Sequence, residues 1–349
     1  MQPERLIKKS LRGMTAFQSD EPAGFRMDTN ANLLGANPVV TRFIGQFDPL
    51  DLNDYPSPHS DLLRKKLSQF HDLDPKQFIV GNGADELLDL IIKCFIDPGD
   101  DLVMPDPTFG MYEVFGKANC ADILKVPLKD GWELDVDGIL KAKKATLLIL
   151  ANPNNPTGNA YRDEDLERIV NEFNGIVVLD EAYSEYAGFS HIEWTRRFDN
   201  LIVLKTFSKA YGLAGLRVGY AVSPKKLIAH LYKAKAPYNV NTISEGIAAM
   251  ALMEKKFLVS TVRRINHERE KMTRKLGELG FGVYPSVTNF LLAKSPIKSR
   301  TLWNRLCKKG IVIRDLGNAP RLKDHVRITL GNPAQNAKLL RALGRSLSK

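Results

Sequence analysis

The sequence has few cysteines, and they are poorly placed for cross-links or metal binding. Cys94, Cys120 and Cys307 are the only three in 349 residues, and they lie far apart, outside the spacings of zinc and redox motifs. This pattern excludes a disulfide framework of the kind that small secreted domains depend on. We expect free thiols in a reducing compartment and no metal site.

Long apolar runs are also missing. No run approaches the roughly 18 consecutive apolar residues that a membrane-spanning helix requires. Residues 1–5 lack the apolar core that a secretory signal peptide carries. We therefore expect a cytoplasmic protein with no membrane partner.

Signatures of nucleic-acid-binding proteins are absent, although the chain is basic. Lysine and arginine number 50 against 40 acidic residues, so the formal net charge is +10. The basic residues are scattered, and no zinc-finger, basic-zipper or RNA-recognition signature occurs, so we expect no nucleic-acid partner. An affinity for small anions and a generally basic surface would both account for the excess.

What the chain does contain is an alternation of strand and helix signals. Short apolar runs, typical of strands buried on both faces, occur at residues 78–80, 102–104, 146–150, 176–179, 201–204 and 218–222. Helical patterns lie between several of them, at residues 84–95 and 163–173. The alternation predicts an α/β fold, with a three-layer α/β/α large domain built on a mostly parallel sheet.

The carboxyl-terminal third has a different pattern, which predicts a smaller α+β domain. Its expected elements are helices at about 257–279 and 333–347 and strands at 281–284, 289–292, 311–314 and 325–330. We place the domain boundaries near residues 36 and 260. The resulting units are an amino-terminal arm (1–35) that packs with the small domain, a large domain (36–260) and a small domain (261–349).

The stretch after the apolar run 201–204 holds a candidate nucleophile. Lys209 stands between small hydroxyl residues and a glycine-broken segment, a poor position for a solvated surface cation. A lysine that is desolvated near another cation loses proton affinity and can attack a carbonyl group. Arg217, Thr206 and Ser208 could hold an anion such as a phosphate beside it. The alternative on local grounds is a lysine that simply reaches out of a loop.

Two further loops have the composition of ligand-binding turns. Residues 81–86 join a strand to a helix, where the backbone of Ala84 and Asp85 could bind a phosphate. A plain turn followed by acidic residues at the helix start would explain the same pattern. In residues 152–158, the side-chain amide of Asn155 could donate to a ligand at the carboxyl end of a strand. Asparagine, proline and glycine also build turns for conformational reasons alone.

A carboxylate ends another apolar run. Asp180 follows residues 176–179, and a buried carboxylate is costly unless a proton or a cation accompanies it. A protonated ring nitrogen of a ligand would be such a partner, and Tyr183 could reach the same ligand. The alternative is that Asp180 caps a following helix.

Taken in order, these motifs resemble those of a known family. They are Gly-Ala-Asp-Glu at 83–86, Asn-Pro-Thr-Gly at 155–158, Asp-Glu-Ala-Tyr at 180–183, and Ser-Lys at 208–209 with an arginine at 217. The chain resembles the fold type I pyridoxal-phosphate-dependent aminotransferases over nearly its whole length. Within them it is most similar to the histidinol-phosphate aminotransferases, for example at 54–56, 107–112 and 326–331.

The resemblance implies that pyridoxal 5'-phosphate is the cofactor. Lys209 would bind it covalently and move a proton between substrate and cofactor, while Asp180 would keep its ring nitrogen protonated. The other contacts would be Asn155 and Tyr183 at the phenolic oxygen, Phe109 on the ring face, and Ala84, Asp85, Thr206, Ser208 and Arg217 around the phosphate. Tyr55 would reach the phosphate of the neighbouring subunit's cofactor, which implies a homodimer with shared active sites.

The resemblance also implies the substrates, an amino acid or amino-alcohol phosphate and a 2-oxo acid. Histidinol phosphate and 2-oxoglutarate would exchange an amino group by a ping-pong mechanism. Arg327 would clamp the substrate α-carboxylate, a task that suits the planar guanidinium group. Arg314 would bind the distal phosphate of the substrate.

Two positions depart from the subfamily pattern. Phe17 stands where a tyrosine often contacts the substrate phosphate, and Ala31 stands where an acidic residue is common. Both changes concern the substrate rather than the cofactor. The alternatives are an aminotransferase of aromatic or broad specificity, a threonine-phosphate decarboxylase on a similar scaffold, and a non-catalytic ligand sensor, against which the intact cofactor set argues.

Overall fold

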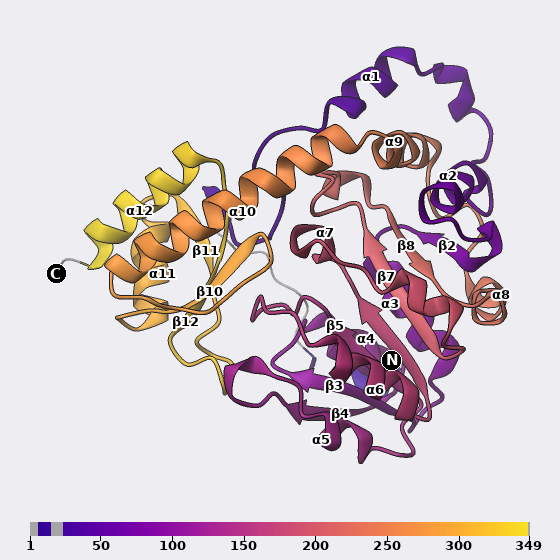
Figure 1. Ribbon diagram of the computed structural model, residues 1–349, viewed down its shortest axis with the longest axis horizontal. Helices are drawn as coiled ribbons and strands as arrows, with labels where there is room; N and C mark the ends of the chain where they lie inside the picture. Colours follow the sequence, from indigo (N-terminus) through magenta and orange to yellow (C-terminus); the bar gives the residue numbers. More distant parts are fainter. Residues whose placement is uncertain (1–5, 15–23, 348–349) are drawn as a thin grey trace.

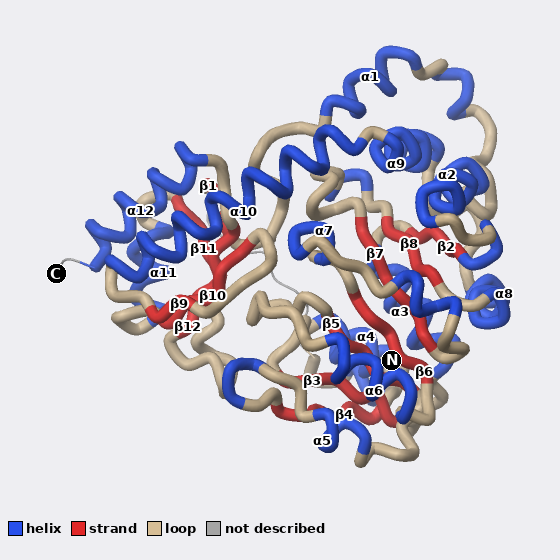
Figure 2. Tube along the Cα trace, in the orientation of Figure 1, coloured by secondary structure: helices blue, strands red, loops and turns tan. Residues whose placement is uncertain are grey.

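The computed structural model describes residues 6–14 and 24–347, and within them the chain forms two β-sheets surrounded by helices (Figure 1). Figure 2 shows the larger sheet enclosed by helices and the smaller sheet beside the carboxyl-terminal helices. Of the described helices, none combines the length and the apolar character that crossing a membrane requires. The three cysteines form no disulfide with one another.

The larger sheet has seven strands in the order β2-β8-β7-β6-β5-β3-β4. The strands are β2 (Phe78–Gly81), β3 (Asp101–Asp106), β4 (Asp122–Pro127), β5 (Leu147–Ala151), β6 (Ile176–Asp180), β7 (Leu201–Thr206) and β8 (Gly219–Val222). All neighbours pair in parallel except β8, which is antiparallel to both β2 and β7. The predicted mostly parallel sheet is therefore confirmed.

Helices cover both faces of this sheet because successive strand side chains point to opposite sides. In β6, Val177 and Leu179 enter one apolar core and Val178 enters the other. The helices on the first face are α1 (Pro38–Gln46), α2 (Asp61–His71), α5 (Val136–Leu140), α6 (Asp163–Glu172) and α9 (Thr242–Met253). Those on the second face are α3 (Ala84–Phe95), α4 (Met111–Ala118) and α8 (Lys225–Ala234). The predicted α/β/α layering is confirmed.

The smaller sheet has five strands in the order β1-β11-β12-β10-β9. The strands are β1 (Phe25–Met27), β9 (Gly282–Val283), β10 (Phe290–Lys294), β11 (Ile311–Asp315) and β12 (His325–Thr329). Apolar residues from α10 (Lys255–Glu278), α11 (Ser299–Cys307) and α12 (Pro333–Leu347) join them in a third core.

Two segments connect the sheets. Strand β1 pairs in parallel with β11 and so adds residues 25–27 of the amino-terminal arm to the smaller sheet, whereas residues 6–14 contact the larger domain, where Lys8 Nζ donates to the carbonyl of Ala118. Helix α10 runs from beside α9 to the smaller sheet (Figure 1), so the predicted boundary near residue 260 falls inside this helix. The division into units at 35 and 260 stays a prediction.

A cluster of charged side chains is buried in the core behind the ends of β6 and β7. Lys205 Nζ lies 2.8 Å from Glu185 Oε1 and 3.3 Å from Glu181 Oε2. Glu181 also accepts from the backbone N–H of His191 and contacts its Nδ1 at 2.8 Å. Burial opposes the charge of Lys205, but the two carboxylates outweigh it and raise the pKa of the amine. The opposite charges compensate one another within the cluster, as buried charges must, although the buried Oε2 of Glu185 accepts no hydrogen bond from a described residue.

His71 packs next to this cluster and is held in its neutral form. Its Nε2 lies 3.0 Å from the hydroxyl of Tyr220. Burial, with help from the positive charge of Lys205 and against that of Glu181, lowers the pKa of His71 from 6.5 to about 4. Below its ordinary pKa the unfolded chain therefore binds a proton at this position that the folded chain does not.

We predict that His71 weakens the fold in mild acid. Its contribution to the free energy of unfolding is full above pH 6.5 and declines as the pH falls toward 4, by a total of about 3 kcal/mol. Urea unfolding between pH 8 and 4 would compare the wild type with His71→Gln, which cannot take up the proton. The difference in unfolding free energy between the two should shrink as the pH falls, and a constant difference would contradict the assignment.

Candidate active site

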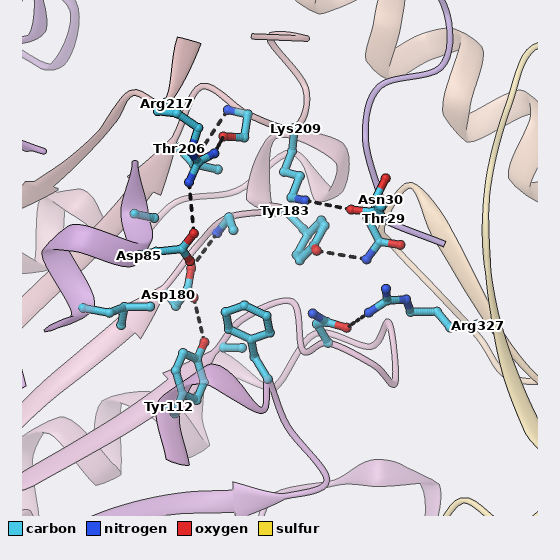
Figure 3. Close-up of a pocket in the computed structure, with 17 residues that line it drawn as sticks. Thr29, Asn30, Asp85, Tyr112, Asp180, Tyr183, Thr206, Lys209, Arg217 and Arg327 are labelled. Carbon is cyan, nitrogen blue, oxygen red and sulfur yellow. Dashed lines mark hydrogen bonds and ion pairs between the residues drawn. The ribbon is translucent and has the colours of Figure 1, made fainter. Parts of the chain in front are cut away.

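A pocket opens at the edge of the larger sheet where β5, β6 and β7 end (Figure 3). Parallel strands place their carboxyl ends at one edge, which is where open α/β sheets bind ligands. The cavity measures about 750 Å³ including the space open to solvent, enough for a small organic ligand. It is lined by Thr29, Asn30, Ala84, Asp85, Leu88, Phe109, Tyr112, Ala151, Asn155, Asp180, Ala182, Tyr183, Thr206, Ser208, Lys209, Arg217 and Arg327.

The pocket brings together residues that are far apart in the sequence. All of the predicted site residues line it except Tyr55 and Arg314. They come from the start of α3, the turn before α4, the ends of the three parallel strands and the small-sheet strand β12. The pocket therefore lies between the two sheets.

Lys209 projects into the pocket from the turn after β7. Its Nζ donates to the carbonyl of Thr29 at 3.3 Å and lies 5.6 Å from the ring centre of Tyr183. The side chain is half-buried, whereas the desolvated lysine of this segment is Lys205, four residues earlier. The amine of Lys209 is therefore accessible from the pocket, as a nucleophile must be.

Asp180 is a buried carboxylate at the floor of the pocket. It is 6% exposed, accepts hydrogen bonds from Tyr112 at 2.6 Å and from the Ala182 backbone at 3.1 Å, and forms no ion pair with a described residue. Burial raises its pKa to about 6, although both hydrogen bonds act in the opposite direction. Such a carboxylate favours a cationic partner on its pocket side, and a protonated pyridine nitrogen fits that requirement.

The start of α3 and the segment after β7 form an anion cradle. The amino terminus of α3 has no side-chain cap, so its first backbone amides are available to an anion. The hydroxyls of Thr206 and Ser208 lie beside it, and Arg217 Nη1 donates to Ser208 at 3.2 Å. Backbone amides, hydroxyls and a guanidinium group are donors that bind phosphate in proteins.

Arg217, which the sequence analysis assigned to an anion, also pairs with a carboxylate of the chain. Its Nη2 pairs with Asp85 Oδ2 at 3.0 Å, so the charge is balanced within the cradle. Close packing of the guanidinium depends on Gly83, where φ is +87° and a Cβ atom would lie 2.5 Å from Arg217 Nη2. Only glycine suits both conditions.

Aromatic and amide groups border the space between Lys209 and Asp180. The hydroxyl of Tyr183 accepts a hydrogen bond from Asn30 Nδ2 at 3.0 Å. Phe109 lines the pocket and meets Tyr112 edge to face, with ring centres 5.4 Å apart. A planar ring between these side chains would have an apolar face and polar edges.

Two arginines stand side by side on the small-sheet wall. Arg327 donates to Asn155 Oδ1 and to the carbonyl of Asp28, both at 2.5 Å, while its buried Nε has no hydrogen-bond partner among the described residues. Arg314 is its register partner on β11, so both side chains point to the same face of the sheet. Burial and the charge of Arg314 lower the pKa of Arg327. An anion beside the pair would relieve this repulsion.

Of the predicted site residues, Tyr55 and Arg314 do not line the pocket. Tyr55 is 77% exposed and stacks on Tyr238, with ring centres 4.8 Å apart, outside the pocket. Phe17 lies outside the described residues. Ala31 follows Asn30 but does not line the pocket.

Sequence reasoning missed several residues that shape the site. They are Thr29, Asn30, Leu88, Tyr112, Ala151 and Ala182. Tyr112 lies in a recognised motif region, and Leu88 was expected only as an apolar residue of the helix at 84–95. No local signal predicts that Tyr112 donates to Asp180, because 68 residues separate the two.

The comparisons with known proteins agree with this geometry. The family described as aminotransferase class I and II matches residues 25–343. A histidinol-phosphate aminotransferase of Caldanaerobacter subterraneus subsp. tengcongensis is 36% identical over 351 residues, covering 99% of this chain and 99% of that protein. The chloroplastic histidinol-phosphate aminotransferase of Nicotiana tabacum is 39% identical over 325 residues, covering 91% of this chain and 78% of that protein.

A solved structure has the same fold. The histidinol-phosphate aminotransferase of Sinorhizobium meliloti, in complex with pyridoxal-5'-phosphate, matches with a TM-score of 0.90 and 26% sequence identity. The match covers 98% of this chain and 97% of that one.

We predict that Asp180 lowers the stability of the cofactor-free protein at alkaline pH. Because its folded-state pKa is raised from 3.8 to about 6, its contribution to stability is lost as the pH rises through 6, by about 3 kcal/mol. Cofactor-free Asp180→Asn should therefore be more stable than wild type toward urea at pH 8. The gain should fall by roughly half at pH 5.

The matched control is Asp130→Asn, at an exposed position, which should change the unfolding free energy little at either pH. A cofactor-free Asp180→Asn protein that is less stable than wild type at pH 8 would show that the carboxylate contributes to the fold.

Proposed function

The chain belongs to the aminotransferase class I and II family, and we propose that it is a pyridoxal-phosphate-dependent histidinol-phosphate aminotransferase. It converts histidinol phosphate and 2-oxoglutarate into imidazole acetol phosphate and glutamate. The observation that carries the proposal is one pocket bordered by the Lys209 amine, the buried carboxylate of Asp180 and the guanidinium group of Arg327 on the small sheet. The similarity to the proteins of that name supports the choice of substrate.

The residues of this chain fit the cofactor at each of its polar groups. Asp180 would pair with the ring nitrogen, Asn155 and Tyr183 with the phenolic oxygen, and Phe109 with the ring face. The start of α3 with Thr206, Ser208 and Arg217 would hold the phosphate. When bound, the cofactor withdraws electrons from the α-carbon of the amino substrate.

Lys209 performs the proton transfer. Its amine lies in the open part of the pocket, with the Thr29 carbonyl as the nearest hydrogen-bond acceptor. In its neutral form the amine would remove the proton from the substrate α-carbon. In its charged form it would deliver a proton to the cofactor. Its position on a turn anchored by β7 keeps the travel of Nζ short.

Asp180 and Tyr183 set the charge of the bound ring system. An ionised Asp180 keeps the ring nitrogen protonated. The positive charge of that nitrogen stabilises the buried carboxylate, which has lost its contact with water. Tyr112 and the Ala182 amide fix the orientation of the carboxylate from behind. The phenol of Tyr183 would contact the phenolic oxygen on the opposite edge of the ring.

The arginine pair selects anionic substrates. Arg327 would bind the carboxylate of the 2-oxo acid and of glutamate, and Arg314 would bind the phosphate of histidinol phosphate. Planar guanidinium groups bind both anions through paired N–H donors. The neutral contacts of Arg327 with Asn155 and Asp28 preset its position without neutralising it.

The functional unit is a homodimer. Tyr55, which does not line the pocket of its own chain, would reach the cofactor phosphate of the partner. Tyr238 stacks on it, and the exposed apolar side chains Ile44, Leu50, Leu52 and Leu62 of the same part of the chain are available for such an interface. We place the protein in the cytoplasm, in keeping with cysteines that form no disulfide with one another.

We predict that Lys209→Ala binds the cofactor without catalysing transamination. Loss of the general base should lower kcat by about 100- to 10,000-fold, and the absorbance maximum of the covalently bound cofactor should disappear. Absorbance spectroscopy and a glutamate-release assay measure the two effects. Lys226→Ala, at an exposed position, is the control and should retain both. Substantial turnover by Lys209→Ala would contradict the catalytic assignment.

Single half-reactions identify the amino donor. The holoenzyme would be mixed separately with histidinol phosphate, an aromatic amino acid, aspartate and threonine phosphate, and the conversion of the cofactor to its amine form would be followed by absorbance. We expect histidinol phosphate to react fastest. A fast reaction with aromatic amino acids and none with histidinol phosphate would overturn this substrate, and release of carbon dioxide without an oxo acid would indicate a decarboxylase.

A further inference from the structure

Asn30 links the small sheet to the pocket through a set of buried hydrogen bonds. Its backbone N–H donates to Thr329 Oγ1 at 3.0 Å, and its carbonyl accepts from Asn289 Nδ2 at 3.0 Å. Both partners lie in or next to the small sheet, at the end of β12 and before β10. Its side-chain Nδ2 donates to Tyr183, which follows β6 of the larger sheet. Asn30 thus bridges the two sheets while it is only 1% exposed.

These hydrogen bonds have a fixed direction. Thr329 Oγ1 accepts from the Asn30 backbone and donates its own proton to Asn30 Oδ1 at 3.1 Å. With Oδ1 held in this way, the amide nitrogen must face Tyr183, and an amide nitrogen can only donate. The phenol oxygen of Tyr183 therefore accepts, and its proton is left to be donated elsewhere. No described residue accepts that proton through a hydrogen bond.

An asparagine meets the requirements of this position better than other residues. Its φ is +55°, in the left-handed region that asparagine adopts more readily than most side chains. Its amide supplies one acceptor for Thr329 and one donor for Tyr183 at the same time. An aspartate of the same shape would accept from both and so reverse the second hydrogen bond.

We propose that Asn30 is a positioning residue that turns the Tyr183 hydroxyl proton into the pocket, toward the phenolic oxygen of the cofactor. The inference rests on the proposed function, because it takes the phenolic oxygen to be the acceptor. Figure 3 shows Asn30 and Tyr183 facing each other, with Lys209 beside the tyrosine ring. Chains of hydrogen bonds strengthen one another, so the Thr329–Asn30 contact makes Tyr183 a better donor.

Because of these hydrogen bonds, the Asn30–Tyr183 contact depends on the position of the small sheet relative to the larger one. Thr329 and Arg327 lie two residues apart on β12, and each reaches the larger domain through an amide, Asn30 in one case and Asn155 in the other. Displacement of β12 would break two hydrogen bonds together, the one that Asn30 donates to Tyr183 and the one that Arg327 donates to Asn155. The small sheet therefore influences both groups expected at the phenolic oxygen.

The test is the pH midpoint of the absorbance change of the bound cofactor. A hydrogen bond to the phenolic oxygen favours its ionised form, so losing it raises the midpoint. In Asn30→Asp the phenol should donate to the new carboxylate instead, and the midpoint should rise by about one unit. Neutral Thr329→Val, which lacks the orienting hydroxyl, should shift it in the same direction by less, while Thr329→Ser should restore the wild-type value.

Asn32→Asp is the matched control. It places the same charge in the same turn, but Asn32 contacts the Ala210 carbonyl and the Leu34 amide rather than Tyr183. Its midpoint should stay close to that of the wild type. In a Tyr183→Phe background, the Asn30→Asp change should add little to the shift that Tyr183→Phe causes alone. An equal shift with and without the tyrosine, or no shift in Asn30→Asp, would overturn the proposal.

A cofactor-free measurement separates this proposal from the proposed function. Asn30→Gly keeps the left-handed backbone and removes the amide, and the melting temperatures of Asn30→Gly, Tyr183→Phe and the double variant form a cycle. We expect the double variant to melt well above the additive value, since the two changes remove one shared contact. Additive losses would overturn the role of Asn30 even if the chain bound no pyridoxal phosphate. A wild type that binds no pyridoxal phosphate would overturn the proposed function and the acceptor named here, while a non-additive cycle would still support the orientation of Tyr183 by Asn30.

Discussion

The parallel register of β5, β6 and β7 is the constraint on which the site depends. Ala151 pairs with Asp180, and Asp180 with Leu204, so β5 and β6 end level with each other and β7 extends two residues further, to Thr206. The residues that follow must leave the sheet at the same edge, and the pocket forms there. Because β8 returns antiparallel beside β7, Arg217 enters the same edge from the opposite direction, and the start of α3 completes the anion cradle.

Burial of charge is arranged differently on the two sides of these strand ends. Behind them, Lys205 and Glu181 satisfy each other and hold the backbone of β6 and β7 in place. On the pocket side, Asp180 is buried without a cation and Arg327 without a carboxylate among the described residues. Unsatisfied charges of this kind reduce stability when the protein is alone and favour ligands of opposite charge. The difference distinguishes the structural cluster from the functional one.

The sequence predicted those elements whose signals are local. The helix predicted at 84–95 coincides with α3 because its apolar residues recur at helical spacing and Gly83 precedes it. Strand β4 was missed because it lies at the sheet edge, with no fully buried residue and a polar, exposed face. The predicted site residues were found through motif order, whereas Asn30 and Tyr112 act through partners 153 and 68 residues away, which no local pattern encodes.

In the proposed reaction, the small sheet would determine which substrates bind through the pair Arg314 and Arg327. Two guanidinium groups opposite each other on neighbouring strands repel, and burial increases the repulsion. A fold retains such a pair at a cost in stability, which an anionic substrate offsets on binding. One substrate of the proposed reaction carries a phosphate and the other two carboxylates, so both half-reactions bring an anion to the same wall. Dual specificity therefore needs no change of pocket shape, only a site that binds either anion.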